Sequence, residues 1–350
     1  MSEDGVEKPS NGTPGVPLRC IVTGGAGFVG SHLVDHLLAA GARVTVVDDF
    51  STGRRENLPD AHASLRVVES DVAAALRAFG PGERFDRIYH LAAAVGVLRV
   101  VRRPIESIEN NVGETASVFR FALEHGPAEG TPARVLFTSS SEVYGKAAKV
   151  PFEEEDDCVY GATTARRWSY AASKALGEHL ALAHHEQHGL PVVVVRLFNT
   201  VGPRQVGDYG MVLPRFVRAA LEGQPSPVHG DGSQTRCFCD VRDVVPALIR
   251  LLETPACDGR VFNLGSDRVI SIADLARQVN ETLGSTAGIL AIPYHDAFGP
   301  GFEDLQHRRP SLDRVREAIG FHPSHDLPQT IRDIADHVRT SGDVPRAHGR

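Results

Sequence analysis

Residues 22–30 read Val22-Thr-Gly-Gly-Ala-Gly-Phe-Val-Gly30, a glycine-rich stretch between a short apolar run and a longer segment. The run before it, Arg19–Val22, has the length of a strand, and Gly30–Ala40 has the length of a helix. The glycines with G-x-x-G-x-x-G spacing are Gly24, Gly27 and Gly30. Glycines let such a turn tighten and let backbone N–H groups approach a pyrophosphate at the positive end of a helix. Because a strand precedes the stretch and a helix follows it, we predict a dinucleotide site.

A carboxylate follows the second predicted strand, Arg43–Val47. Asp48 lies 24 residues after Gly24, where a carboxylate binds both hydroxyls of a ribose and repels a 2′-phosphate. This favours NAD over NADP, although Arg54 and Arg55 lie near enough in the chain to leave NADP open. The residues of this half of the chain expected to bind the cofactor are Gly24, Gly27, Phe28, Val29, Gly30, Asp48, Asp71 and Val72.

Apolar runs continue to alternate with amphipathic stretches along the chain. The further predicted strands are Leu65–Glu69, Arg87–Leu91, Arg134–Thr138, Val192–Leu197 and, with a weaker pattern, Val261–Leu264. The further predicted helices are Ile105–His125 and Ser169–His188. Strands that are apolar throughout, each followed by a helix, form a parallel sheet covered on both faces. We therefore predict an α/β fold, a Rossmann-type doubly wound parallel sheet.

Pro and Gly become denser after Gly202, and the regular alternation weakens. We expect a smaller, discontinuous substrate-binding lobe there. The expected units are a disordered leader at 1–17, an NAD-binding domain at 18–201 plus about 238–265, a lobe at about 202–237 and 266–335, and a disordered tail at 341–350.

Composition excludes several classes of partner. The chain has 350 residues and a net charge of -7, and its Lys and Arg are scattered, so we expect no nucleic-acid partner. It has no apolar run long enough to span a bilayer and no secretory signal, so we expect no membrane partner. Its five cysteines lack metal-type spacing, and His184-His-Glu-Gln-His188 does not match H-E-x-x-H. We therefore expect no metal and a cytoplasmic location.

Tyr170 and Lys174 lie four residues apart in a predicted helix and so share one face of it. A free tyrosine has a pKa near ~10 and is a poor base at neutral pH. A cation one turn away and a positive nicotinamide ring favour its phenolate, which takes a hydroxyl proton while hydride leaves the same carbon. Y-x-x-x-K is common by chance on helices, but Ser140, just past the strand Arg134–Thr138, adds a hydroxyl for the reacting oxygen. These residues predict an NAD-dependent oxidation of an alcohol.

Together these motifs resemble the extended short-chain dehydrogenase/reductase superfamily over about residues 18–335. The residues that carry the resemblance are Thr23–Gly30, His90-Leu-Ala-Ala93, Asn111, Ser140, Tyr170, Lys174 and Asn199 within Leu-Phe-Asn-Thr-Val-Gly-Pro-Arg204. The resemblance implies cofactor contacts from Leu91, Ala92, Ala93 and Asn111, and a nucleotide-sugar diphosphate near Asn199. It also implies oxidation of a sugar at C4 and a homodimer through the helices around 105–125 and 169–188.

The residues just past Ser140 distinguish the reactions of this superfamily. In Ser140-Ser-Glu-Val-Tyr-Gly145, Ser141 replaces the aspartate with which 4,6-dehydratases protonate the leaving hydroxyl, while Glu142 is kept. This pattern resembles UDP-glucuronate decarboxylases, and so do Gln234–Asp243 and Gln306–Ser311. The resemblance implies decarboxylation of UDP-glucuronate to UDP-xylose, with release of UDP-4-keto-xylose left open.

A C5 carboxylate beside a C4 ketone leaves as CO2, and its electrons form an enolate that needs electrostatic support and then a proton. The resemblance assigns the carboxylate or, alternatively, the diphosphate to Arg308, and the diphosphate to Arg236. It assigns the proton to Glu142, directly or through a water. Xylose synthases also have a uridine-binding arginine near Met211, where this chain has none; Arg215 is the candidate replacement.

Three alternatives remain open. His90-Leu-Ala-Ala-Ala-Val-Gly-Val97 resembles 4-epimerases of the superfamily, so a 4-epimerase acting on UDP-glucose or UDP-glucuronate is the second hypothesis. A 4,6-dehydratase is the third, and Ser141 argues against it. An NAD-sensing regulatory protein would commonly have lost Tyr170 or Lys174, and this chain keeps both.

Overall fold

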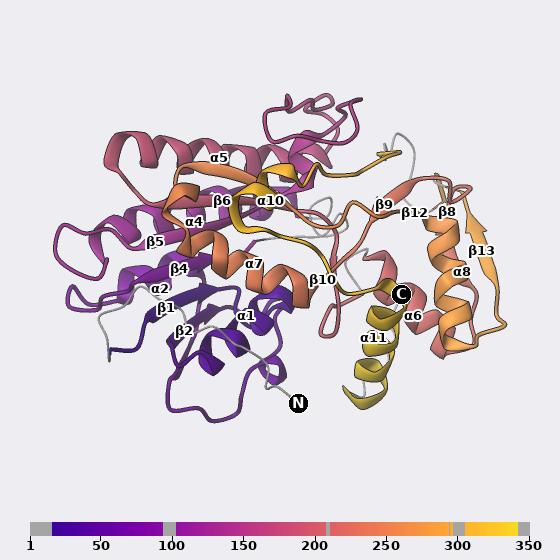
Figure 1. Ribbon diagram of the computed structural model, residues 1–350, viewed down its shortest axis with the longest axis horizontal. Coiled ribbons are helices and arrows are strands. Elements are labelled where there is room, and N and C mark those ends of the chain that lie inside the picture. Colours follow the sequence, from indigo (N-terminus) through magenta and orange to yellow (C-terminus); the bar gives the residue numbers. More distant parts are fainter. Residues whose placement is uncertain (1–15, 94–102, 208–210, 294, 297–304, 342–350) are drawn as a thin grey trace.

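The computed structural model describes residues 16–93, 103–207, 211–293, 295–296 and 305–341. The strands of its main sheet are β1 (Arg19–Thr23), β2 (Arg43–Asp48), β3 (Leu65–Glu69), β4 (Arg87–His90), β5 (Arg134–Ser140), β6 (Val192–Leu197) and β11 (Arg260–Leu264). They are all parallel and lie in the order β11-β6-β5-β4-β1-β2-β3 (Figure 1). The chain order reverses between β1 and β4, as in doubly wound sheets, and this confirms the predicted fold class.

Helices cover both faces of this sheet (Figure 1). One layer contains α1 (Phe28–Ala39), α7 (Val241–Glu253) and α10 (Asp313–Ile319), and the other contains α2 (Val72–Ala78), α4 (Pro104–Glu124) and α5 (Trp168–His188). Strand β6 shows why both layers are needed. Val193 and Val195 belong to one core and Val192 and Val194 to the other, and all four are fully buried. A strand that is apolar on both faces is stable only between two layers.

A second group of elements extends from the carboxyl edge of the sheet. It contains α6 (Val212–Leu221), α8 (Ile272–Leu283) and α11 (Leu327–Ser341), which share a third core, and the parallel pair β8 (Ser226–His229) and β13 (Ile289–Ile292). Two further pairs are β9 (Thr235–Cys237) with β12 (Val269–Ser271), and β7 (Thr200–Val201) with β10 (Cys239–Asp240). Short 3-10 turns are η1 (Arg55–Asn57), η2 (Ser141–Tyr144) and η3 (Pro255–Cys257).

The structure differs from the predictions at several boundaries. Strand β5 continues to Ser140 instead of ending at Thr138, because its pairing with β6 extends as far as Leu197. The C-terminal part of the expected lobe is also divided: Val315 and Ile319 of α10 pack in a core of the main sheet. The expected leader and tail, apart from Val16, Pro17 and Ser341, lie outside the described residues.

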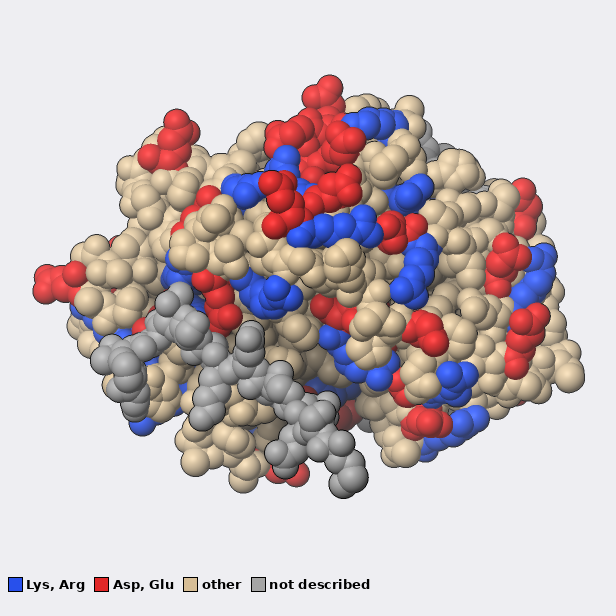
Figure 2. All heavy atoms as spheres, in the orientation of Figure 1, with Lys and Arg blue, Asp and Glu red and all other residues tan. Residues whose placement is uncertain are grey.

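Charged side chains of both signs are mixed on the surface, as the scattered Lys and Arg of the sequence predict. Figure 2 shows acidic and basic side chains interspersed over the face in view. Within the described part of the chain, no helix combines the length and apolar character needed to cross a membrane.

Candidate active site

A cavity of about 990 Å³ lies where the carboxyl ends of the sheet strands meet the lobe. Every residue assigned to the site from the sequence lines this cavity, with the exception of Asn111. Asn111 is buried on α4, and its amide Nδ2 donates to Ser173 Oγ on α5 at 3.2 Å. It therefore joins two helices beside the cavity. Ligands of open α/β sheets bind in this crevice at the strand ends.

The glycine-rich turn lies closely against the neighbouring strand end. Gly24 has a positive φ of 69°, and a Cβ there would lie 2.8 Å from the backbone nitrogen of Ala92. A Cβ on Gly30 would lie only 2.1 Å from the Gly24 carbonyl oxygen. Any larger side chain at these two positions would force the turn open. The sequence therefore needs glycine here to bring the start of α1 up to the cavity.

Asp48, at the end of β2, is held by the same turn. Its carboxylate accepts hydrogen bonds from the backbone N–H groups of Ala26 at 2.8 Å and Phe50 at 2.9 Å. Burial raises the pKa of Asp48, and these two hydrogen bonds oppose that effect. Arg54 and Arg55 do not line the cavity. The carboxylate at the strand end is therefore suited to ribose hydroxyls, and no arginine from this loop faces it to receive a 2′-phosphate.

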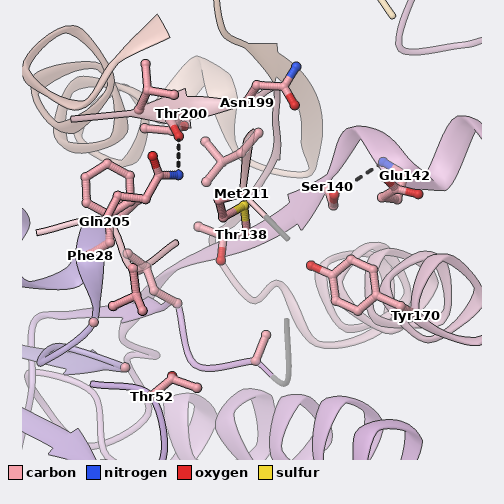
Figure 3. Close-up of a pocket in the computed structure, with 18 of the residues that line it drawn as sticks. Phe28, Thr52, Thr138, Ser140, Glu142, Tyr170, Asn199, Thr200, Gln205 and Met211 are labelled. Atoms are coloured by element: carbon pink, nitrogen blue, oxygen red, sulfur yellow. Dashed lines mark hydrogen bonds between the residues drawn. The ribbon is translucent and has the colours of Figure 1, made fainter. Parts of the chain in front are cut away.

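Tyr170, Lys174 and Ser140 meet at the end of β5. Figure 3 shows the Tyr170 hydroxyl directed from α5 toward Ser140. Lys174 is buried, and its Nζ donates to the Thr138 carbonyl at 2.9 Å. Burial lowers the pKa of Lys174 to about 8, while Glu114 and Glu178 oppose that effect.

The pKa of Tyr170 is raised by burial and by the Glu142 carboxylate, and only its hydrogen bond with Ser140 opposes them. Tyr170 is therefore a neutral phenol in the protein alone. A positive charge brought close by a bound cofactor would favour the phenolate.

The turn after β5 carries a cluster of three charges. Arg308 Nη2 donates to one oxygen of Glu142 at 2.6 Å, and Arg167 Nη2 donates to the other at 3.2 Å. Arg308 also reaches Ser141 Oγ at 3.5 Å, and its Nε is buried without a hydrogen-bond partner among the described residues. Burial alone would raise the pKa of Glu142, but the two guanidinium groups lower it to about 2. Glu142 is therefore ionised throughout the physiological range.

The lobe contributes basic side chains to the cavity. Arg236 is buried and donates to the Thr235 carbonyl at 2.8 Å. Arg215 is partly buried, and burial lowers its pKa. Asn199 has a positive φ of 23° and donates to the Cys237 carbonyl at 2.9 Å. The sheet side of the cavity carries acids, whereas the lobe side carries arginines, so the lobe side is suited to an anionic group.

Arg167 and Glu114 also line the cavity, although the sequence predicts no role for them. Arg167 lies just before the predicted helix Ser169–His188, three residues before Tyr170. Glu114 lies on α4, and burial raises its pKa to about 7 while the Val72 N–H donates to it. In the sequence Glu114 is one charged residue of an amphipathic helix, and no local pattern sets it apart. Among the described residues, no group of three or more His, Cys, Asp or Glu side chains is placed to hold a metal ion.

Comparison with known proteins agrees with this geometry. A model of the NAD dependent epimerase/dehydratase family matches residues 20–265. A UDP-N-acetyl-alpha-D-glucosaminuronate decarboxylase from Bacillus cytotoxicus is 38% identical over 322 residues, which cover 92% of this chain and 98% of the relative. UDP-glucuronic acid decarboxylase 2 from Arabidopsis thaliana is 36% identical over 330 residues, which cover 92% of this chain and 69% of the relative.

Solved structures give the same result. The epimerase Mth375 from Methanothermobacter thermautotrophicus superposes with a TM-score of 0.83 at 30% identity, covering 93% of this chain and 94% of that one. A dTDP-glucose 4,6-dehydratase from Streptomyces venezuelae, solved with NAD and TYD bound, superposes with a TM-score of 0.81 at 27% identity, covering 93% and 98%. The chain therefore belongs to the NAD dependent epimerase/dehydratase family and is an NAD-dependent enzyme.

Proposed function

We propose that this enzyme decarboxylates a UDP-linked hexuronic acid, with UDP-glucuronate as the first candidate substrate and UDP-xylose as the product. The observation that carries the proposal is the buried guanidinium of Arg308 at the cavity beside Glu142. Two guanidinium groups, those of Arg167 and Arg308, share this single carboxylate, and their side chains are only 7% and 8% exposed. Arg308 lines the cavity and therefore presents a cation to a ligand bound there.

A buried cation that lines a ligand cavity is stabilised by an anionic group that accepts a hydrogen bond from it. A hexuronate has such a group, the carboxylate at C5, whereas a neutral hexose has none. The buried Arg308 Nε, which has no partner among the described residues, adds a further donor for such a group. Arg308 is therefore proposed to bind the carboxylate that leaves as CO2.

The C4 oxidation is proposed to use Tyr170, Lys174 and Ser140. NAD, when bound, supplies the acceptor for the C4 hydride and later returns it. Tyr170 takes the C4 hydroxyl proton, and the Ser140 hydroxyl holds the same oxygen. When the C5–carboxylate bond breaks, its electron pair passes into an enolate whose negative charge lies on the C4 oxygen. The same two hydroxyl groups then donate to that oxygen, so they support both steps.

The proton added at C5 is proposed to come from a water held by Glu142. A carboxylate with a pKa of about 2 is a poor acid at neutral pH, because it has no proton to give. It remains a strong acceptor and can orient a water near the sugar. Glu142 also keeps Arg167 and Arg308 apart and fixed, since it accepts from each with a different oxygen.

The remaining polar residues are proposed to bind the two nucleotides. On the lobe side, Asn199, Arg215 and Arg236 would hold the diphosphate and uridine of the substrate. On the sheet side, the glycine-rich turn and Asp48 would hold NAD, with the adenine near Asp71 and Val72. The N-cap role of Asp71, which accepts from the Ala74 N–H at 2.7 Å, fixes that turn.

A product assay tests the proposal directly. The enzyme with NAD is incubated separately with UDP-glucuronate, UDP-N-acetylglucosaminuronate, UDP-glucose and TDP-glucose, and CO2 and products are followed by mass spectrometry. We expect CO2 and a UDP-pentose from a uronate, and no turnover by Tyr170→Phe although it still binds NAD. The acetamido uronate is included because of the Bacillus cytotoxicus relative. Conversion of a substrate to its C4 isomer without CO2 would establish a 4-epimerase instead.

We also propose a homodimer and a cytoplasmic location. Exposed apolar side chains lie on α4 and α5: Ile105 is 70% exposed, Ile108 41% and Leu176 47%. Two copies of this helix pair would bury these side chains against each other. All five cysteines are free thiols, as in reducing compartments. Light scattering of the purified enzyme tests the dimer, and Ile105→Lys should shift it toward the monomer.

A further inference from the structure

The face of α5 that carries Tyr170 and Lys174 also carries Glu178, one turn beyond Lys174. Tyr170, Lys174 and Glu178 are spaced by four residues and so lie along one side of the helix. Each bonds to a different one of three successive residues of β5. The three contacts are Tyr170 with the Ser140 hydroxyl, Lys174 with the Thr138 carbonyl, and Glu178 with the Ser139 hydroxyl at 2.5 Å. Glu178 is therefore the third contact that sets α5 against β5.

Glu178 is balanced by a cation from the next strand. Arg196 of β6 donates to it through Nη2 at 2.7 Å and through Nε at 3.0 Å. Both residues are 5% exposed. Replacing a buried pair with apolar residues is often neutral for stability, whereas removing one partner is costly. Stability alone therefore does not explain a buried pair at this position, and its geometry is the property to explain.

Arg196 also connects β6 to the segment that carries Arg308. Its guanidinium lies 4.7 Å from the centre of the Tyr144 ring, and the Tyr144 hydroxyl donates to Asn263 at 2.7 Å. Asn263 Nδ2 donates to the Phe152 carbonyl at 3.0 Å. Phe152 in turn forms a parallel bridge with Pro310, two residues beyond Arg308.

We propose that Glu178 and Arg196 form a positioning pair that keeps the oxidising residues of α5 and β5 and the carboxylate-binding Arg308 in one geometry. Neither residue contacts the substrate in this proposal. The part concerning Arg308 rests on the proposed decarboxylation, while the part concerning Tyr170 and Lys174 applies to any alcohol oxidation by this enzyme.

Glu178 also acts on the charge of Lys174. The charged or titratable groups near Lys174 are Glu114 from α4, Glu178 from α5 and His90 from β4. Tyr170 lies one turn before Lys174 on the same face of α5. Burial lowers the pKa of His90 to about 3, so His90 is neutral at working pH. The carboxylates of Glu114 and Glu178 raise the pKa of Lys174, so loss of Glu178 should lower it. Lys174 would then lose its proton at a lower pH. The oxidation, which needs the Lys174 cation, would decline at that lower pH as well.

The test compares Glu178→Gln with a charge-free double variant, Glu178→Gln with Arg196→Gln. The matched control is Glu253→Gln, which breaks another largely buried ion pair, with Arg87 at 2.5 Å, at the other end of the sheet. Each variant is measured for kcat, KM, the pH profile of kcat and the melting temperature. NADH absorbance after mixing with substrate reports the oxidation step separately from CO2 release.

For Glu178→Gln we expect kcat to fall on the order of 100-fold with KM changed less than about 3-fold, because a displacement near 1 Å has that effect on chemistry. The alkaline limb of its pH profile should move to lower pH by on the order of half a pH unit. The double variant should have a higher melting temperature than Glu178→Gln, but its kcat and its alkaline limb should stay as they are in Glu178→Gln. Glu253→Gln should have a lower melting temperature than wild type, with the kcat and the alkaline limb of wild type.

Recovery of kcat and of the alkaline limb in the double variant would overturn the proposal, because the pair would then serve stability alone. An unchanged profile in Glu178→Gln would overturn it as well. Failure of the proposed decarboxylation looks different: the wild-type enzyme itself would release no CO2. The same variants would then be compared on whichever nucleotide sugar produces NADH, where the loss of oxidation by Glu178→Gln is still expected.

Discussion

The guanidinium of Arg308 lies 2.6 Å from the Glu142 carboxylate, although 166 residues separate the two in the chain. One residue belongs to the turn after the central strand β5, and the other to the C-terminal segment that returns to it. Neither motif indicates a carboxylate site by itself. Their contact places the buried Arg308 cation at the cavity, and the proposed decarboxylation depends on that charge.

Arg308 gives the most direct test of that charge. We expect Arg308→Gln to lower the rate of CO2 release at least about 100-fold, because the carboxylate and the developing charge lose a buried cation. Arg308→Lys should recover part of the rate, since it keeps the charge but loses the planar fork. Arg309→Gln, an exposed neighbour, is the control and should remain near wild type. Equal rates in Arg308→Gln and wild type would exclude the assignment.

Asp48 should determine the choice of cofactor. Asp48→Asn keeps the size of the side chain but removes the charge that binds ribose hydroxyls and repels a 2′-phosphate. We expect NAD to bind on the order of 10-fold more weakly and the preference over NADP to shrink, as one charged hydrogen bond implies. Fluorescence titration of both cofactors measures this. Asp60→Asn, an exposed carboxylate outside the cavity, should leave both affinities unchanged.

Gly30 should be essential for the dinucleotide site. In Gly30→Ala the new methyl group would lie 2.1 Å from the Gly24 carbonyl, so the turn must open. We expect loss of measurable NAD binding, together with a fall in melting temperature. Gly113→Ala in α4 is the matched control, because its Cβ meets nothing within 4 Å. That variant should be as stable as wild type or about 0.5–1 kcal/mol more stable, as expected for Gly to Ala in a helix. Normal NAD affinity in Gly30→Ala would contradict the assigned turn.

The predictable part of the fold is the part that local pattern determines. The strands Leu65–Glu69 and Val192–Leu197 were predicted with the observed bounds, because their apolar runs end at polar or turn residues. Strand β5 was predicted two residues short, since Ser139 and Ser140 look like turn residues. Their place in the strand depends on pairing with β6, which only the folded sheet supplies.

The candidate site divides in the same way. Tyr170 and Lys174 were identified because their spacing on one helix has chemical meaning. Arg167 was not assigned to the site, because its function depends on a contact with Glu142, 25 residues away, and on the arrival of Arg308. The ionisation state of Glu142 could not be predicted from the sequence either. Its pKa follows from burial and from two cations that the sequence does not place beside it.

The pKa of Glu142 predicts how stability depends on pH. It lies at about 2 in the folded protein against an ordinary value of 4.5, so the folded state holds this proton less tightly than the unfolded state. The stabilisation is therefore complete above about pH 4.5 and is lost as the pH falls toward 2, by on the order of 1 kcal/mol for each pH unit.

The variant Glu142→Gln tests this dependence, because its side chain cannot titrate. We expect this variant to be less stable than wild type, with the largest difference in unfolding free energy at neutral pH. The difference should shrink between about pH 5 and about pH 3.5, because wild type loses its stabilisation there. Urea unfolding at several pH values measures it. Glu155→Gln, which removes a carboxylate whose side chain is 82% exposed and paired with Arg314, is the control and should show a small difference that varies little. A deficit in Glu142→Gln that stays constant over the same range would show that the two arginines do not hold this carboxylate ionised.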